Sequence, residues 1–305
     1  MCSSDLLRCA LPIYPSIATA AQLKQMLHSS NDNYFEWRFG NIYYTKKGTG
    51  SPILLIHDTL PGASGYEWSK IEDELAIDHT VYTVDLLGCG RSDKSSITYT
   101  NFVYVQMISD FIKKIIGQKT DVIASGFSGS FVTMACHNEK ELFNKIMLVN
   151  PPSLTQLKQM PNRKDRLLKA ALEIPIFGTL VYHMIVSRDN INNLFIEKMY
   201  YNPFHVDNQM ADAYYEAAHK GGYYTRFLYS SLAAKYININ ICHALKALDN
   251  SIYIVEGETE PNGKAVTDDY CASNPAIEVS VLKETKHLPH VEAPEAFLEQ
   301  VKIFF

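Results

Sequence analysis

The stretch Val122–Ser130 constrains the fold of this chain more than any other. A short run of mostly β-branched residues, Val122-Ile123-Ala124, ends at Gly126, and the apolar run Phe131–Ala135 follows at once. Such a pattern predicts a buried strand that turns directly into a helix. A serine at so sharp a turn is held in a strained backbone conformation, and the residues two positions away must be small. Gly126 and Ser130 meet that requirement, so the spacing predicts Ser128 as an exposed nucleophile. The same letters also suit an ordinary Gly- and Ser-rich loop.

Strands and helices alternate along most of the chain, which predicts an α/β fold with a mostly parallel central sheet flanked by helices. The uninterrupted apolar run Ile53–Ile56 is typical of a strand covered on both faces. The expected strands and helices of the first part are a hairpin over Tyr34–Thr45, strands at Ile53–Ile56, Thr80–Val84 and Phe143–Val149, and helices at Ala18–Ser30, Tyr66–Leu75 and Tyr104–Ile116, the last closed by Gly117.

Residues 153–248 interrupt this alternation with helical patterns and no strand. We interpret this block as an inserted all-helical lid between residues 15–152 and residues 249–305 of one core. The lid helices are expected at Leu167–Val186, Asn190–Tyr200, Asp207–His219 and Tyr224–Ala234. The core resumes with strands at Ile252–Val255 and Ile277–Leu282 and a closing helix from Pro294.

Composition excludes several classes of function. At 305 residues and 47% hydrophobic, the chain can bury a large core, and its net charge of −5 is spread without a basic stripe, which argues against nucleic acid. No apolar run approaches the roughly 20 residues that span a bilayer. The six cysteines lack regular spacing, which argues against a disulfide framework. Neither Cys-x-x-Cys nor His-x-x-x-His occurs, so the sequence gives no indication of a zinc site. The simplest expectation is a cytoplasmic protein with a small-molecule substrate; the sequence leaves the oligomeric state open.

Residues 1–14 look foreign to the rest of the chain. Residues 2–6 (Cys-Ser-Ser-Asp-Leu) and residues 9–13 (Cys-Ala-Leu-Pro-Ile) are two reading frames of one nucleotide string, TGTGCTCTTCCGATCT, which resembles the end of a sequencing adapter. We therefore interpret this leader as translated adapter. A native signal or anchor at the N-terminus could then have been lost.

Three further stretches follow predicted strands and join the Val122–Ser130 turn at one edge of the sheet. The loop His57–Gly62 follows the first buried strand, Glu260 follows a late strand, and His287 follows the last one. Open α/β sheets place their sites at the carboxyl ends of parallel strands.

The residues 34–305 resemble the α/β-hydrolase family, in which serine, acid and histidine occur in this order. In that family the sharp turn that carries the nucleophile is called the nucleophile elbow, which the stretch Val122–Ser130 resembles. The resemblance rests on this elbow, the loop His57-Asp58-Thr59, the block Asp85–Asp93, the turn at Glu260 and the tail from His287 to Glu295. That block is typical of the lidded branch, which holds esterases, carbon–carbon bond hydrolases, epoxide hydrolases and dehalogenases. A serine at the elbow speaks against the last two, whose nucleophile is an aspartate.

The resemblance implies a serine hydrolase acting on an ester, thioester or amide of a small, largely apolar acyl group. Ser128 would attack, His287 would serve as base and then acid, and Glu260 would orient His287. The N–H groups of Thr59 and Gly129 would bind the oxyanion. No cofactor or metal is needed.

Several alternatives stay open. Glu256, Glu258 and Asp268 compete with Glu260 as the acid, and His290 lies near His287. A carbon–carbon bond hydrolase would share the same triad.

Asp58, Ser130 and Glu260 depart from the usual residues of the family, which favours a second hypothesis: a catalytically degenerate protein that keeps the pocket and binds a ligand.

Among the other polar residues nearby, His57 is expected to be structural, Arg91 and Asp93 to hold their loop together, and Cys89 to be unreactive.

Overall fold

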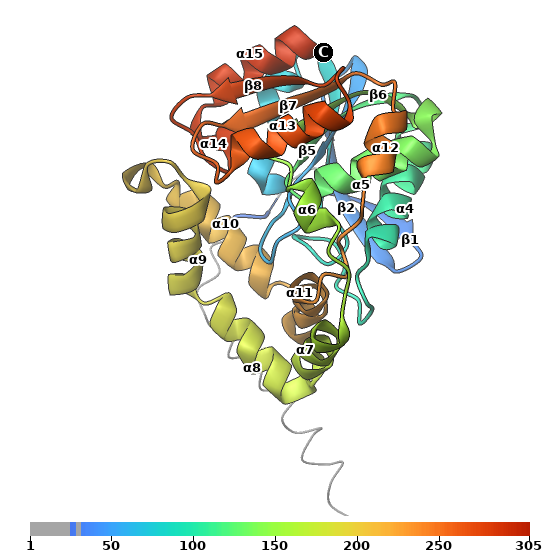
Figure 1. Cartoon of the computed structure of the whole chain (residues 1–305). Coiled ribbons are helices and arrows are strands. Elements are labelled where there is room, and N and C mark those ends of the chain that lie inside the picture. The colour runs from blue at the N-terminus through green and yellow to red at the C-terminus, as the bar shows by residue number, and fades with distance from the viewer. Residues whose placement is uncertain (1–24, 29–31) are drawn as a thin grey trace, which may run out of the picture.

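An eight-stranded sheet with helices on both faces forms the core of the protein (Figure 1). The computed structural model describes residues 25–28 and 32–305, so the predicted leader at 1–14 and most of the helix predicted at Ala18–Ser30 lie outside the described residues. The strand order is β1-β2-β4-β3-β5-β6-β7-β8. The pairs β1–β2 and β2–β4 are antiparallel, and the other neighbouring pairs are parallel. The predicted fold class is therefore confirmed. The strands are β1 (Asn33–Trp37), β2 (Gly40–Lys47), β3 (Ser51–Ile56), β4 (His79–Val84), β5 (Thr120–Ser125), β6 (Phe143–Val149), β7 (Ile252–Gly257) and β8 (Glu278–Leu282).

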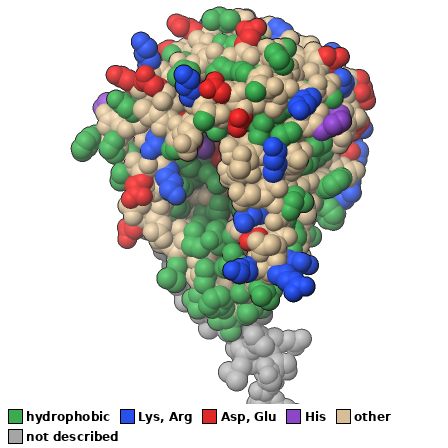
Figure 2. Space-filling model, viewed as in Figure 1, with side chains coloured by type: hydrophobic (Ala, Val, Ile, Leu, Met, Phe, Trp, Pro, Cys, Tyr) green, Lys and Arg blue, Asp and Glu red, His purple; other side chains and the backbone are tan. Residues whose placement is uncertain are grey.

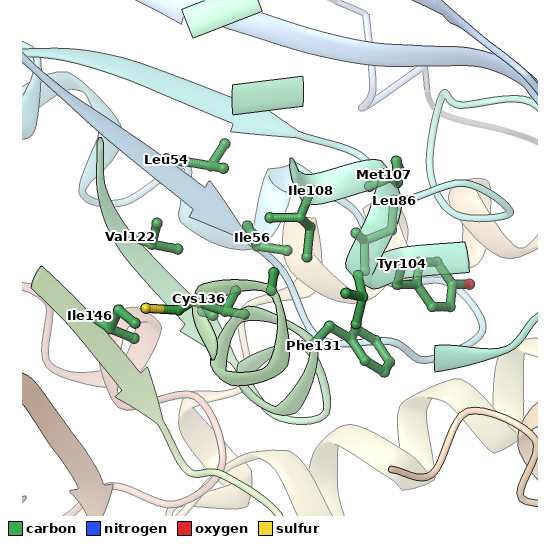
Figure 3. Close-up of a cluster of buried hydrophobic side chains, with 14 of the residues drawn as sticks. Leu54, Ile56, Leu86, Tyr104, Met107, Ile108, Val122, Phe131, Cys136 and Ile146 are labelled. Carbon is green, nitrogen blue, oxygen red and sulfur yellow. The ribbon is translucent and has the colours of Figure 1, made fainter. Parts of the chain in front are cut away.

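Strand β3 shows why an uninterrupted apolar run belongs in the centre of this sheet. Ile53 and Leu55 point to one face and Leu54 and Ile56 to the other, and all four are fully buried. Figure 3 shows the second face, where strand residues meet Tyr104, Ile108 and Phe131. The first face packs against η1 (Gly65–Trp68), α3 (Glu72–Leu75) and α15 (Pro294–Phe304); the second packs against α4 (Asn101–Phe111), α5 (Ser128–Asn138), α12 (Cys242–Ala247) and α13 (Gly263–Ser273).

Two of the helices predicted for the core are each divided into two segments. The helix predicted at Tyr66–Leu75 is two short helices, η1 and α3. Helix α4 continues as the π-helix η2 (Ile112–Ile116), which ends at Gly117 in a left-handed conformation with φ +73°, as predicted. The remaining short helices of the core are η3 (Lys140–Leu142) and α14 (Pro289–Glu292).

Between β6 and β7 the described chain is helical and contains no strand. The helix predicted at Leu167–Val186 is in fact two helices, because Ile174 has an extended ψ of 125° and Pro175 begins a new helix. The axes of these two helices differ by 96°. The helices here are α6 (Leu154–Leu157), α7 (Arg163–Glu173), α8 (Pro175–Ile185), α9 (Arg188–Leu194), η4 (Phe195–Met199), η5 (Pro203–His205), α10 (Asn208–His219), η6 (Gly222–Tyr224) and α11 (Thr225–Ala233).

Candidate active site

The sharp turn between β5 and α5 is centred on Gly126. Its φ of +54° lies in the left-handed region, which a glycine adopts without steric cost. The N–H of Gly126 still donates to the carbonyl of Val149 (2.9 Å), so the strand pairing runs right up to the turn. Two positions to either side lie the small residues Ala124 and Ser128. The backbone thus turns from strand to helix at Gly126, two residues before Ser128.

Ser128 lies instead in the first turn of α5 and is fully buried. Its hydroxyl donates to the carbonyl of Ser125 at 2.6 Å and lies 3.3 Å from the carbonyl of Ile56. The N–H of Gly129 donates to the carbonyl of Gly126 (3.2 Å). The structure therefore brings neither Ser128 nor Gly129 to His287. The sequence pattern alone does not choose between the two positions, because small residues lie two positions away from both Gly126 and Ser128.

Asp58 takes the space that an elbow side chain would fill. Its Oδ1 accepts hydrogen bonds from the backbone N–H groups of Thr59 (2.6 Å) and Phe127 (2.8 Å). Its Oδ2 lies 3.4 Å from Nε2 of His287. A Cβ built on Gly126 would fall only 2.1–2.4 Å from the carboxyl atoms of Asp58. The carboxylate of Asp58 and a side chain at position 126 are therefore mutually exclusive.

The two N–H groups that hold Asp58 come from different loops and converge on one oxygen. This is the geometry that binds an oxyanion in acyl-transfer sites. The prediction placed the N–H of Thr59 at an oxyanion; in this structure that N–H binds the protein's own carboxylate, with Phe127 in the place predicted for Gly129. The close approach of Asp58 to Gly126 and Phe127 was not predicted from the sequence. Asp58 stood out only as a departure from the family.

His287 and Glu260 come together as predicted. Nδ1 of His287 lies 3.3 Å from Oε1 of Glu260, while Nε2 faces Asp58, so the imidazole lies between two carboxylates. Asn150, which the sequence analysis missed, holds this loop: its Nδ2 donates to the carbonyls of Lys286 (2.8 Å) and His287 (2.9 Å). Because Asn150 follows β6, it links the central sheet to the histidine.

The other candidate acids have different surroundings. Glu258 accepts a hydrogen bond from the N–H of Glu284 (3.0 Å). Glu256 is buried against Gly263, and burial raises its pKa. Asp268 lies on α13. Among these four carboxylates, the structure gives only Glu260 a contact with His287.

The charge on His287 follows from its neighbours. Burial alone would lower its pKa, but the hydrogen bonds to Asp58 and Glu260 outweigh burial and raise the pKa to about 10. The two carboxylates therefore favour the protonated, imidazolium form of His287. An imidazolium has no lone pair with which to accept a proton from a nucleophile.

Three polar residues have the supporting contacts that were predicted. His57 contacts the carbonyl of Asp58 through Nδ1 (2.6 Å) and accepts the N–H of Leu86 at Nε2 (3.0 Å). Arg91 forms a buried ion pair with Asp85 (2.8 Å). Asp93 accepts the N–H of Asn41 (2.7 Å). These contacts fix the loops after β3 and β4 around the site.

Cys89 and His290 do not contact Asp58 or His287. Burial raises the pKa of Cys89 to about 12, so it remains a thiol, as expected. His290 is fully buried, stacks on Trp68 with a ring distance of 4.3 Å, and lies 3.3 Å from a carboxylate oxygen of Glu67.

A pocket of about 540 Å³ opens in front of Asp58, Gly126 and His287. Figure 2 shows it as a recess lined largely by hydrophobic side chains between the core and the helical segment. The apolar lining residues are Leu60, Phe127, Pro151, Pro152, Leu194, Met199, Pro261 and Val266. Within the described part of the chain, no cluster of three or more His, Cys, Asp or Glu side chains could hold a metal ion.

The steric exclusion at Gly126 predicts a measurable loss of stability. Ala at position 126 or 117 would adopt a positive φ, which costs about 1–2 kcal/mol. A Cβ at Gly117 meets nothing within 4 Å, whereas at Gly126 it overlaps Asp58. We expect Gly126→Ala to lower the free energy of unfolding by about 1–3 kcal/mol more than Gly117→Ala, measured by denaturant titration. Equal losses in the two variants would contradict the overlap.

Comparison with solved structures supports the fold. The carbazole-degradation serine hydrolase CarC superimposes with a TM-score of 0.72 at 18% identity, covering 90% of this chain and 97% of that one. The carboxylesterase CesB from Bacillus subtilis superimposes with a TM-score of 0.69 at 14% identity, covering 96% and 97%.

Sequence relatives cover less of the chain. The 2-hydroxy-6-oxo-6-(2'-aminophenyl)hexa-2,4-dienoic acid hydrolase of Metapseudomonas resinovorans is 29% identical over 138 residues, which are 43% of this chain and 47% of that protein. The soluble epoxide hydrolase of Corynebacterium sp. (strain C12) is 24% identical over 109 residues, or 36% and 37%. This chain thus aligns with less than half the length of either relative. A model of the alpha/beta hydrolase family matches residues 53–300, and the chain belongs to that family.

Proposed function

We propose that this protein binds a small, largely apolar molecule in the pocket before Asp58 and His287, and that it forms no acyl-enzyme on a serine. One observation carries the proposal: the carboxylate of Asp58 occupies both the oxyanion-binding N–H groups and the space of an elbow side chain. A substrate carbonyl would have to displace a charge-assisted hydrogen-bonded carboxylate before its own oxygen could be stabilised.

The state of the histidine supports the same conclusion. A serine nucleophile requires a neutral imidazole beside it, yet His287 contacts two carboxylates, which raise its pKa and favour its charged form. For Ser128 to react, its hydroxyl would have to leave the carbonyl of Ser125 and emerge from the buried first turn of α5. The hypothesis of a degenerate, ligand-binding member of the family thus fits this geometry better than a serine esterase.

The helical segment contributes to the proposed binding site. Leu194 and Met199 line the pocket opposite the strand ends, and the carbonyl of Met199 accepts the N–H of His287 (3.1 Å). We propose that residues 153–248 act as the lid that covers a bound ligand. A pocket of this size, in which apolar side chains alternate with polar and charged ones, suits a small molecule.

A second function is favoured by the orientation of Asp58. Its Oδ1 is held by two N–H groups, while Oδ2 faces His287 at the pocket. Such a carboxylate could attack an electrophilic carbon through Oδ2, so that a carbon–oxygen bond forms as the leaving group departs with its electron pair. The resulting ester would be hydrolysed by water, which returns the carboxylate. Esterification removes one of the two negative charges that raise the pKa of His287, which would free the imidazole as a base. One sequence relative is named as an epoxide hydrolase.

Mass spectrometry of labelled protein separates these functions. We expect the wild-type protein to give no adduct with a fluorophosphonate probe, and Ser128→Ala to behave identically. The protein is also incubated in ¹⁸O-water with a panel of terminal epoxides and alkyl halides. Substrate turnover with ¹⁸O in the peptide containing Asp58 would favour the carboxylate nucleophile. Absence of ¹⁸O, together with saturable binding of small apolar ligands that Leu194→Arg abolishes, supports the binding protein. A fluorophosphonate adduct on Ser128 would overturn both.

A further inference from the structure

The helices α7 and α8 expose an unusual number of large apolar side chains at the end of the molecule away from the sheet. Figure 1 places these helices at the lower end of the molecule, and Figure 2 shows hydrophobic side chains gathered there with Lys and Arg side chains beside them. Phe177 is 52% exposed, Met184 70% and Leu167 72%, although large apolar side chains are usually buried. We call this the α7–α8 surface; its apolar members are Leu167, Leu168, Ile174, Ile176, Phe177, Leu180 and Met184.

The apolar side chains of α8 form a stripe along one side of that helix. Ile176, Leu180 and Met184 are four residues apart, so they lie on one face, and all are exposed. The opposite side of α8 is buried through Gly178 and Tyr182. Tyr182 donates its hydroxyl hydrogen to the carbonyl of Ala218 (2.8 Å), which anchors α8 on α10. The buried contacts of Gly178 and Tyr182 therefore fix the orientation of α8, which keeps the apolar stripe on the exposed side.

The corner between the two helices is rigid. Pro175 begins α8 directly after Ile174, and the helix axes differ by 96°. A Cβ on Gly178 would lie 1.7 Å from the carbonyl oxygen of Leu172, so the two helices touch through their backbones there. No single helix in the described residues is long and apolar enough to cross a bilayer, but α7 and α8 together reach that length and hydropathy. A right-angled pair cannot cross a bilayer as one straight span; it suits insertion into the interface.

Cationic side chains flank the apolar ones. Arg163, Lys164 and Arg166 are exposed on α7, although the whole chain carries a net charge of −5. The two acidic side chains of these helices are both engaged: Asp165 caps α7, and Glu173 pairs with Lys169. An exposed apolar stripe beside unneutralised Lys and Arg is the pattern of helices that lie in the headgroup region of anionic membranes.

We propose that the α7–α8 surface docks on an anionic lipid membrane. Phe177 and its apolar neighbours would enter the boundary between headgroups and acyl chains, while Arg163, Lys164 and Arg166 would contact the lipid phosphates. The membrane would cover the exposed apolar side chains, and the bend at Pro175 would keep both helices in the plane of the interface.

Vesicle flotation tests this proposal with the full chain. The vesicles are phosphatidylcholine alone, or phosphatidylcholine with about a third phosphatidylserine. We expect wild type to float with the anionic vesicles and to bind them at least about tenfold more weakly when phosphatidylserine is absent or when the salt is raised to 0.5 M. Phe177→Glu with Leu180→Glu should abolish flotation. The matched control is Phe102→Glu, since Phe102 is 76% exposed on α4, far along the chain from this surface.

A second variant and the oligomeric state complete the test. Lys164→Glu with Arg166→Glu should weaken binding to anionic vesicles about tenfold or more while leaving circular dichroism and the melting temperature unchanged. Flotation that is equal in wild type and in Phe177→Glu/Leu180→Glu would overturn the proposal. A second result would also overturn it: wild type does not bind vesicles, light scattering shows it as a dimer, and Phe177→Glu/Leu180→Glu is a monomer. The α7–α8 surface would then be an interface between two copies of the chain.

Discussion

Replacing Asp58 by Gly and Gly126 by Ser together should convert this protein into one that a fluorophosphonate probe labels at residue 126. Asp58→Gly frees the N–H groups of Thr59 and Phe127, which now hold the carboxylate. The new serine would place its hydroxyl in the vacated space beside Nε2 of His287, where Oδ2 of Asp58 lies at 3.4 Å. With one carboxylate removed, the pKa of His287 falls and the imidazole can accept a proton.

The expected gain is large because several effects act together. One oxyanion donor is worth about 10²–10³ in rate, so the double variant should hydrolyse p-nitrophenyl acetate at least about a hundredfold faster than wild type. The measurements are labelling by intact mass and the rate of p-nitrophenol release.

Three controls identify the source of this activity. Asp58→Gly alone should remain unlabelled, because position 126 then has no hydroxyl. Gly126→Ser alone should be destabilised, because its Cβ overlaps Asp58. Adding Ser128→Ala to the double variant should leave labelling intact. If labelling disappears with Ser128→Ala, Ser128 is the nucleophile after all and the assignment of the elbow to Gly126 fails.

The stability of the protein should fall steeply as the pH rises through the alkaline range because of His287. Its pKa is 6.5 in a free side chain and about 10 in the fold, so the folded state holds the proton more tightly than the unfolded state. The stabilisation is fully present below about pH 6.5 and is lost as the pH approaches and passes 10. One pKa unit corresponds to about 1.4 kcal/mol, so a contribution of a few kcal/mol is expected. Denaturant titrations between pH 6 and pH 10 measure it.

Two variants isolate this contribution from the tyrosines, lysines and cysteines that also titrate at high pH. His287→Gln should show a shallower decline in the free energy of unfolding over the same range. Asp58→Asn removes one carboxylate but keeps its shape, so the pKa of His287 should fall, and the decline should be smaller and end at a lower pH than in wild type. The imidazole signals in NMR spectra report that pKa directly. A His287 pKa near 6.5 in wild type would contradict the proposed charge array.

The sequence predicted the fold well because its signals are local. An apolar run such as Ile53–Ile56 forms a strand covered on both faces wherever helices are available to cover it. His287 and Glu260 were also predicted to meet, since both follow strands whose carboxyl ends share one edge of the sheet. The kink at Pro175 was missed, although a proline after eleven helical residues was a readable signal.

The sequence leaves the position of the elbow ambiguous, because two interpretations of one stretch are locally equal. Between Ala124 and Ser130 both Gly126 and Ser128 have small residues two positions away. The choice depends on where β5 ends, and that is decided by its pairing with β6, where Ser125 lies opposite Val149 and the N–H of Gly126 still bonds to it. No pattern within the stretch carries this information.

The amino-acid sequence by itself thus determined the α/β fold, the helical segment and the meeting of His287 with Glu260, because hydrophobic periodicity and strand order set them. Only the tertiary structure decided that the turn after β5 bends at Gly126 and that the N–H groups of Thr59 and Phe127 bind the carboxylate of Asp58. Asp58 and Gly126 are 68 residues apart in the sequence, so no local pattern relates them. In the fold they are adjacent, and because Gly126 has no side chain, the carboxylate of Asp58 can occupy the space beside it.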